Sequence, residues 1–413
     1  MTAIISVLNK KAVAVAADSA VTIDDKKVYM HGEKLFALSP NAPVAVAIYG
    51  NLNLISVPWD ILVKEYAKHL YQQPPFPSLK DYAMQFFEFL HQRHFYLSPQ
   101  IQKTRLQRDM LIYAKSIITN TIVDYANMAP ADLERRYEQQ ITDLLNGQYA
   151  NITIMESLNH LSLEDFIAEN DALIDYVISC IQVDFHIQTN KASLSDLLYR
   201  VFCSQIAITN HTGLVFVGYG EEEIYPSLYN YEIRDIINCR IAAKENKESR
   251  VVIDNPDNPT ISSFAQNDMF HAIVKGISPE VKNCYADAFK ETYQDIISKI
   301  NSLIPEGSPK LDGAIQTTLN QYYNQMLTDY QTKANHKAYD NYIKPIVDSI
   351  GALDKLDLAD FAENIIKVTE IRRNIMTEQL NTVGGPIDVL VITKGDGLVW
   401  MKRKQYIEHS INP

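Results

Sequence analysis

The first 50 residues alternate short apolar runs with polar turns, a pattern that predicts β-strands rather than helices. The apolar runs fall at residues 4–8, 12–17, 35–38 and 44–49, and a hairpin is predicted at 21–29. The start does not match a signal peptide, because Asn9, Lys10 and Lys11 split its apolar stretch and no basic segment precedes it. The pattern therefore places the first residues of the chain inside the fold.

Apolar residues then recur at helical spacing, and residues 78–203 are predicted to be mostly helical. Further strands are predicted at residues 207–209, 214–217, 233–241 and 250–253. A helix is predicted directly after Ser262 and Ser263. The rest of the chain predicts helices at 279–303, 310–350 and 356–380 and a closing hairpin at 387–393 and 398–402. Sheets interrupted by helical blocks favour layered packing, in which helices cover the faces of sheets.

Two helix starts are predicted from hydroxyl residues that precede an acidic residue by three positions. Ser162 is followed by Asp165, and Ser193 is followed by Asp196. In this arrangement the hydroxyl accepts a hydrogen bond from a main-chain N–H of the first helical turn.

The composition narrows the class of protein. The chain has 413 residues and a formal net charge of −12, which predicts two to three domains or one elaborated domain. The acidic balance argues against nucleic acid as a main partner, and no apolar run is long enough for a membrane helix. Four scattered cysteines form no metal-binding spacing and no disulfide framework, so we expect a reducing, cytoplasmic compartment.

The candidate chemistry lies at the N-terminus. Removal of Met1 would give Thr2 a hydroxyl nucleophile and a free α-amine, whose unperturbed pKa of about 7.7–8.0 leaves it partly available as a base at neutral pH. A cation such as Lys34 would disfavour a second positive charge and keep the amine neutral. Asp18 would pair with Lys34, and the N–H of Gly50, at a strand end, would stabilise an oxyanion.

The same residues carry a resemblance to a known family. The segment after Met1 reads TAIISVLNKKAVAVAADSAVT, and Asp18 and Lys34 follow Thr2 by 16 and 32 residues. This resembles proteasome β-type subunits and the bacterial HslV protease, which share these separations. Residues 33–38, 44–50, 212–219, 226–229 and 383–389 resemble later segments of that family. The resemblance implies an α+β fold, the four-layer αββα sandwich of N-terminal nucleophile (Ntn) hydrolases, with added helical insertions.

The resemblance also implies a domain organisation. Residues 1–77 form the N-terminal half of the core, 204–304 form core strands and a helix, and 356–413 form a core helix and hairpin. Residues 78–203 and 305–355 are helical insertions. Ser263 is assigned as an accessory serine, and four residues are assigned to substrate binding: Val21, Thr22, Phe36 and Ile48. Leu380 and Val383 stand where the family carries a supporting Asp and Ser.

The expected function is an N-terminal threonine hydrolase that cleaves peptide or amide bonds without a metal or an organic cofactor. Expected partners are a peptide or protein substrate, a second copy of the chain in a homo-oligomer, and a regulatory ATPase, with no nucleic acid and no membrane. Two alternatives stay open: a small-molecule amidohydrolase of the same fold, and an inactive Ntn-fold protein used for assembly or partner binding.

Two other clusters have simpler interpretations. His91 and His94 have no third ligand nearby, so we expect a surface pair rather than a metal site. The basic run Lys402–Arg403–Lys404 is interpreted as a solvated face, and Gln266 has no assigned role.

Overall fold

The computed structural model describes residues 2–23, 27–39, 42–92, 98–206, 211–253, 258–266, 268–303, 313–375 and 383–404. The chain divides into two compact units. Unit 1 comprises Met1–Lys34, Ile224–Pro226 and Val252–Pro413, and unit 2 comprises Leu35–Glu223 and Ser227–Val251.

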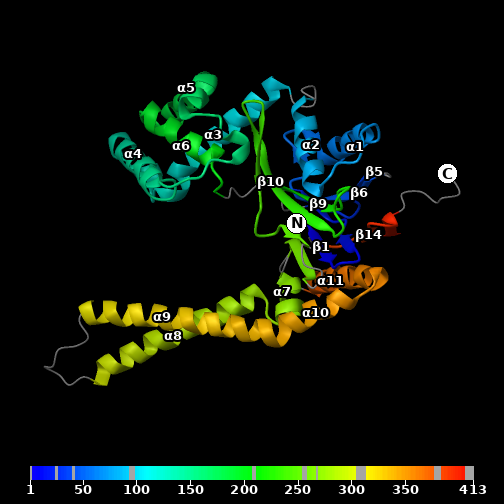
Figure 1. The fold of residues 1–413 in the computed structure, drawn as a ribbon. Coiled ribbons are helices and arrows are strands. Elements are labelled where there is room, and N and C mark those ends of the chain that lie inside the picture. Colours follow the sequence, from blue (N-terminus) through cyan, green and yellow to red (C-terminus); the bar gives the residue numbers. More distant parts are fainter. Residues whose placement is uncertain are drawn as a thin grey trace. The chain divides into compact units, whose positions relative to one another are not determined.

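Unit 1 is built on a five-stranded antiparallel sheet (Figure 1). In spatial order its strands are β13 (Thr260–Ala265), β1 (Ala3–Leu8), β2 (Val13–Ala17), β14 (Asp388–Thr393) and β15 (Gly397–Lys402). Ser6 of β1 lies opposite Val15 on one side and Ser262 on the other. The predicted N-terminal strands and the closing hairpin are confirmed.

Helix α11 (Lys355–Ile375) packs against one face of this sheet. Successive side chains of a strand point to opposite faces, so Ala3, Ile5 and Val7 share the face that contacts α11. Small side chains on the neighbouring β2 let the helix lie close. This packing holds the start of the chain in the interior of unit 1.

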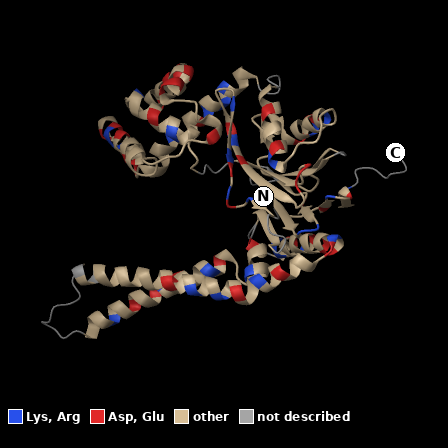
Figure 2. Ribbon diagram, in the orientation of Figure 1, with Lys and Arg blue, Asp and Glu red and all other residues tan. Residues whose placement is uncertain are grey.

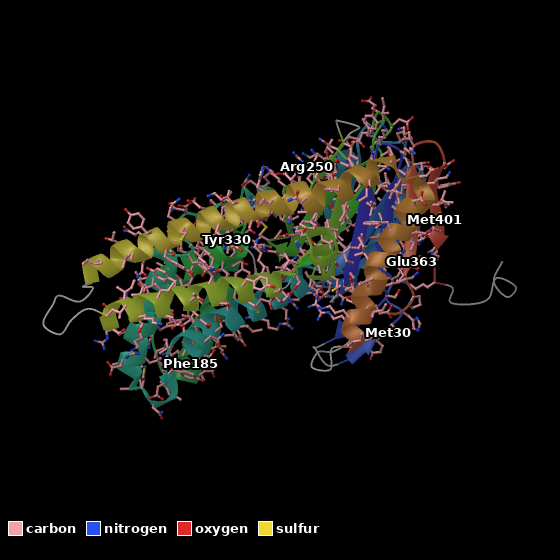
Figure 3. All side chains as sticks on the ribbon, turned by 90° about the horizontal axis from the view of Figure 1, so that it is seen from below. Met30, Phe185, Arg250, Tyr330, Glu363 and Met401 are labelled. Atoms are coloured by element: carbon pink, nitrogen blue, oxygen red, sulfur yellow. The ribbon has the colours of Figure 1, made fainter. Side chains whose placement is uncertain are left out.

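The other elements of unit 1 are a small hairpin and a series of helices. They are β3 (Val21–Ile23), β4 (Lys27–Tyr29), α7 (Asp268–Lys275), α8 (Pro279–Leu303), α9 (Gly313–Ala338), the π-helix η4 (Tyr339–Ile343) and α10 (Lys344–Ala352). Helices α8 and α9 run side by side as a long antiparallel pair (Figures 1 and 3).

Unit 2 contains a second antiparallel sheet and the larger helical block. The sheet order is β11 (Arg240–Glu245), β10 (Ser227–Ile237), β9 (Thr212–Gly218), β6 (Ala42–Gly50) and β5 (Leu35–Ser39), with β12 (Val251–Val252) paired to β10. Helices α1 (Trp59–Leu70) and α2 (Leu79–Gln92) cover one face through an aromatic core that includes Trp59, Tyr66, Phe86 and Phe216. A short pair, β7 (Asn53–Leu54) and β8 (Val57–Pro58), precedes α1.

The helical block of unit 2 has a hydrophobic core of its own. Its elements are α3 (Pro99–Thr121), η2 (Tyr125–Asn127), α4 (Pro130–Asn146), η3 (Glu156–Leu158), α5 (Leu163–Phe185) and α6 (Lys191–Cys203). The hairpin of β10 and β11 contributes Ile237 and Ala242 to this core. The fold is therefore α+β, with a helix-covered antiparallel sheet in each unit and added helical insertions.

Three local predictions are wrong. Residues 233–241 form the hairpin of β10 and β11 rather than one strand, because Asn238 and Cys239 adopt left-handed backbone angles with φ of 50° and 61°. The segment around Ser262 and Ser263 is a strand, and the next helix begins only at Asp268. The predicted strand at 207–209 lies outside the described residues.

The third error concerns the start of α6. The N-cap is Asn190, whose side chain accepts hydrogen bonds from the N–H groups of Ala192 and Ser193, so Ser193 lies inside the helix. The other predicted cap is confirmed, because Ser162 Oγ accepts a hydrogen bond from Asp165 N–H. No helix in the described ranges has the length and apolar composition needed to cross a membrane.

Candidate active site

Thr2 is the first described residue and lies directly before β1. Its side chain and main chain are almost completely buried, with 3% exposure. Its carbonyl oxygen accepts a hydrogen bond of 3.0 Å from Gln266 N–H, at the end of β13. Thr2 is therefore held at the point where β1 begins and the antiparallel β13 ends.

Asp18 follows β2 and collects four hydrogen bonds. One carboxylate oxygen accepts from Ala3 N–H at 2.9 Å and from Lys34 Nζ at 2.6 Å. The other accepts from the N–H groups of Ala20 and Gly384, each at 3.2 Å. Four donors from separate segments determine the orientation of this carboxylate.

Lys34 lies in the loop before β5 and contacts the carboxylate of Asp18. Its Nζ donates to Asp18 and to the carbonyl oxygen of Ala20, and the residue is only 1% exposed. Burial lowers the pKa of Lys34, the charge of Asp18 opposes this, and the nearby Lys404 ammonium lowers the pKa further.

The shared carboxylate oxygen connects Lys34 to the residue that follows Thr2. Ala3 N–H and Lys34 Nζ both donate to it, at 2.9 Å and 2.6 Å. The ammonium therefore lies near the start of β1. The sequence-predicted residues Asp18 and Lys34 are thus in contact, and their catalytic roles stay a prediction.

Gly384 contributes a contact that the sequence did not reveal. Its N–H donates to Asp18, and its carbonyl oxygen accepts from Ser19 N–H at 3.1 Å. It precedes Gly385, whose φ of 77° and close approach to Met30 O leave no room for a side chain. In this turn a main-chain N–H supports Asp18. Leu380 lies outside the described residues.

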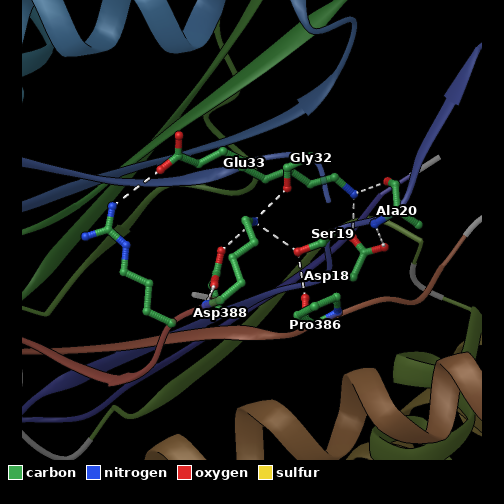
Figure 4. Close-up of polar contacts among 10 residues, drawn as sticks. Asp18, Ser19, Ala20, Gly32, Glu33, Pro386 and Asp388 are labelled. Carbon is green, nitrogen blue, oxygen red and sulfur yellow. Dashed lines mark hydrogen bonds and ion pairs between the residues drawn. The ribbon is translucent and has the colours of Figure 1, made fainter. Parts of the chain in front are cut away.

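A second buried ion pair lies beside the first (Figure 4). Lys404 Nζ donates to Asp388 at 2.8 Å, to Gly32 O at 2.8 Å and to Ser19 Oγ at 3.0 Å. Ser19 Oγ in turn donates to Pro386 O at 2.6 Å. One ammonium therefore ties the segments that carry Asp18 and Lys34 to the C-terminal strand pair.

This arrangement corrects the interpretation of residues 402–404 as a solvated face for Lys404 alone, because the side chains of Lys402 and Arg403 are each 54% exposed. Lys404 has a side chain that is only 5% exposed. Lys402 pairs with Glu363 at 2.6 Å, and Arg403 pairs with Glu33 at 3.4 Å. The run is basic because each of its members meets a different carboxylate.

Gln266 is a second neighbour of Thr2 that sequence reasoning missed. Besides its main-chain bond to Thr2, its side-chain oxygen accepts a hydrogen bond from Arg373 of α11. Arg373 also reaches Asp268 at 3.4 Å. Register, not composition, identifies Gln266, because it directly follows the end of β13, where Ala265 pairs with Ala3.

Ser263 lies elsewhere in the sheet. It pairs with Ile5 in the interior of β13, and residues that are directly opposite each other share a face of the sheet. Ile5 belongs to the core under α11, so Ser263 points toward that helix layer. Its assignment as an accessory serine came from the family resemblance and stays a prediction.

Gly50 belongs to unit 2, at the end of β6. It has a φ of 78°, and a Cβ there would lie 2.2 Å from His211 O. Both facts require glycine for structural reasons. An oxyanion role for its N–H stays a prediction.

The four residues assigned to substrate binding have different surroundings. Val21 is half-buried in β3, and the side chain of Thr22 lies outside the described residues. Phe36 and Ile48 are 4% and 1% exposed and belong to the core under α1 and α2. The packing of Phe36 and Ile48 explains their apolar character, and substrate binding stays a prediction for all four. Of the predicted surface pair, His91 lies in the last turn of α2 and His94 lies outside the described residues.

Comparison with known proteins gives little similarity. No protein-family model matches the chain, and no curated protein matches it. Among solved structures, Anbu (ancestral beta-subunit) from Yersinia bercovieri aligns over 97% of this chain and 88% of its own, with 10% identity and a TM-score of 0.27. An Anbu mutant from Hyphomicrobium sp. strain MC1 aligns over 100% of this chain and 91% of its own, with 10% identity and a TM-score of 0.24.

These findings contradict the assignment of the chain to the proteasome β-subunit and HslV family. The segments that suggested it are short, and the similarity does not extend to the rest of the chain at a level that any family model detects. The chain is similar to solved Anbu structures only at 10% identity and at TM-scores too low to support an argument.

Proposed function

We propose that the protein is an N-terminal threonine hydrolase that cleaves amide bonds. The observation that carries the proposal is the single oxygen of Asp18 that binds both Lys34 Nζ and Ala3 N–H. In this proposal the Lys34 ammonium acts beside Thr2, the residue that becomes N-terminal when Met1 is removed. A cation in that position favours the neutral, basic form of the new α-amine.

The reaction uses two groups of one residue. The α-amine of Thr2 takes the hydroxyl proton as Oγ attacks the carbonyl carbon of the substrate. The tetrahedral intermediate collapses when the C–N bond breaks, and the leaving nitrogen takes the proton from the amine. Water then attacks the resulting ester, gives its proton to the amine, and releases the acid and free Thr2.

The supporting residues have separate roles in this proposal. Asp18 holds Lys34 and keeps the ammonium charged, and Lys34 tunes the amine. Gly50 N–H is proposed as the oxyanion donor, a contribution whose loss costs about 2.7–4 kcal/mol in other hydrolases. Val21, Thr22, Phe36 and Ile48 are proposed to bind the substrate, and the apolar members Val21, Phe36 and Ile48 would favour an apolar residue before the cleaved bond.

Two other functions are tested beside this one. One is a small-molecule amidohydrolase of the same fold, and the other is a protein in which Met1 is retained and the fold serves assembly or partner binding.

Hydrolysis assays distinguish these functions. Fluorogenic peptides with Leu, Glu or Arg before the reporter, and small N-acyl amino acids, are incubated with the wild type, Thr2→Ala and Thr2→Ser. We expect turnover of Leu peptides, loss of at least 100-fold in Thr2→Ala, and partial activity in Thr2→Ser. Turnover of N-acyl amino acids alone identifies the small-molecule amidohydrolase. Equal rates in the wild type and Thr2→Ala overturn the proposal.

A further inference from the structure

A groove lies at the base of the α8–α9 pair. None of the residues described above as contacting Thr2, Asp18 or Lys34 lines it. It has a volume of about 870 Å³ and is lined by residues of α7, α8, α9 and η4. Ligand sites in proteins commonly have volumes of 300–1,000 Å³. All of its lining residues belong to unit 1.

Aromatic side chains form the body of the groove. Phe289 of α8 stacks on Tyr330 of α9, with ring centroids 5.9 Å apart and planes 8° apart. Tyr285 and Tyr339 line the same groove, and Tyr330 is labelled on α9 in Figure 3. Tyr285, Tyr330 and Tyr339 are each more than half exposed, so their rings present apolar surface that the chain itself does not cover.

The charge of the lining is one-sided. Lys275, Lys282, His271 and His336 line the groove, and no Asp or Glu does so among the described residues. The whole chain carries a formal net charge of −12, so the positive charge of this lining is opposite in sign to the net charge of the protein. Figure 2 shows that α9 itself has few charged residues.

Two nearby carboxylates already have partners. Asp268 pairs with Arg372 at 3.2 Å, and Asp340 pairs at 3.3 Å with His336 of the groove lining, so the positive charge that a ligand would meet is that of Lys275 and Lys282. Burial lowers the pKa of Lys275, and the charge of Lys282 lowers it further. An anion between these two lysines would relieve their repulsion.

We propose that this groove binds a free anionic amphiphile, with an apolar or aromatic body and one carboxylate, sulfonate or phosphate head. The body lies on Phe289 and Tyr330, and the head lies between Lys275 and Lys282. An inorganic anion would leave the aromatic rings exposed, and a neutral apolar molecule would leave the two ammonium groups without an anionic partner in the groove, although Lys282 Nζ donates a hydrogen bond to Asn335 at 3.1 Å. The proposal does not depend on amide hydrolysis at Thr2.

Two dyes with similar bodies test the charge requirement. 1-Anilinonaphthalene-8-sulfonate carries a sulfonate, and N-phenyl-1-naphthylamine has the same aromatic body without it. We expect saturable binding of one sulfonate dye per chain and at least tenfold weaker binding to Lys275→Met/Lys282→Met. The neutral dye should bind both proteins within twofold.

The matched control is Lys290→Met, which removes an exposed lysine of α8 outside the groove lining. It should bind both dyes as the wild type does. Phe289→Ala should weaken both dyes, and circular dichroism checks that each variant is folded. The proposal is wrong if the sulfonate dye does not saturate, or if the double lysine variant and Lys290→Met behave alike.

The source of the ligand is tested by competition. Monomeric decanoate, below the concentration at which it forms micelles, should displace the sulfonate dye, and decanol should not. Co-sedimentation with phosphatidylglycerol vesicles without displacement by decanoate would overturn the proposal in favour of a membrane surface. Dye binding that disappears as the chain self-associates at higher concentration would overturn it in favour of an interface between copies.

Discussion

Asp18 and Lys34 form a 2.6 Å ion pair in which the side chains are 0% and 1% exposed. Removing one partner of such a pair leaves an unpaired buried charge, which costs about 3–5 kcal/mol. Lys34→Met should therefore lower the free energy of unfolding by that amount. Asp18→Asn/Lys34→Met should recover part of the loss, because neither charge remains. Urea titration measures both, and strictly additive effects would contradict the coupling.

Lys404 should contribute strongly to the stability of the fold, although it lies near the C-terminus. Its ammonium contacts Asp388, Ser19 and Gly32, so Lys404→Met should destabilise the fold by about 3–5 kcal/mol and slow any reaction at Thr2. Lys402→Met is the matched control, because Lys402 is half exposed and its partner Glu363 keeps Lys367. It should cost less than about 1 kcal/mol. Equal losses of unfolding free energy in the two variants would show that the buried contacts of Lys404 stabilise the fold no more than the exposed ion pair of Lys402 does.

Asp235 should give a pH-dependent stability. Burial raises the pKa of its carboxyl from 3.8 to about 6, although Arg105 lies 3.7 Å away. Between these values the folded state binds more protons than the unfolded state, so the free energy of unfolding falls as pH rises. Asp235→Asn should therefore stabilise the protein by about 1–3 kcal/mol at pH 8 and not at pH 3.5. Chemical denaturation at the two pH values measures this. A gain in unfolding free energy that is the same at both pH values would contradict a raised pKa for Asp235.

The start of α6 offers a local test. Asn190 accepts hydrogen bonds from Ala192 and Ser193, so Asn190→Ala should cost about 1 kcal/mol. Ser193→Ala changes a residue inside the helix and should cost a few tenths of a kcal/mol or less. Thermal unfolding of the two variants compares them, and a larger effect for Ser193→Ala would restore the capping pattern that the sequence suggested.

Local sequence patterns predicted many of the strands and helices. Strands β1, β2, β14 and β15 were predictable because their apolar runs are bounded by turns, and α8 because Pro279 follows Ser278 at its start. The turn at Asn238 and Cys239 had a usable signal, since asparagine favours the left-handed conformation. Strand β13 gave no clear pattern, because its half-buried positions include Ser262 and Ser263 and its partner β1 lies far away in the chain.

Only part of the candidate site could be predicted from the sequence. Spacing suggested Asp18 and Lys34, and the structure brings them into contact. Lys404 and Gln266 could not be found in this way, because each is identified by a partner that only the folded sheet brings near. Lys404 reaches back 385 residues to Ser19, and Gln266 reaches Thr2 through strand register.

The most direct test of the central claim is the intact mass of the protein before and after incubation with a peptide epoxyketone. This reagent forms a stable ring only with a free N-terminal amine and the adjacent hydroxyl. The account predicts loss of Met1 and a single adduct that maps to Thr2 and is absent from Thr2→Ala. Retention of Met1 with no adduct would contradict it, because a blocked amine cannot act as the base.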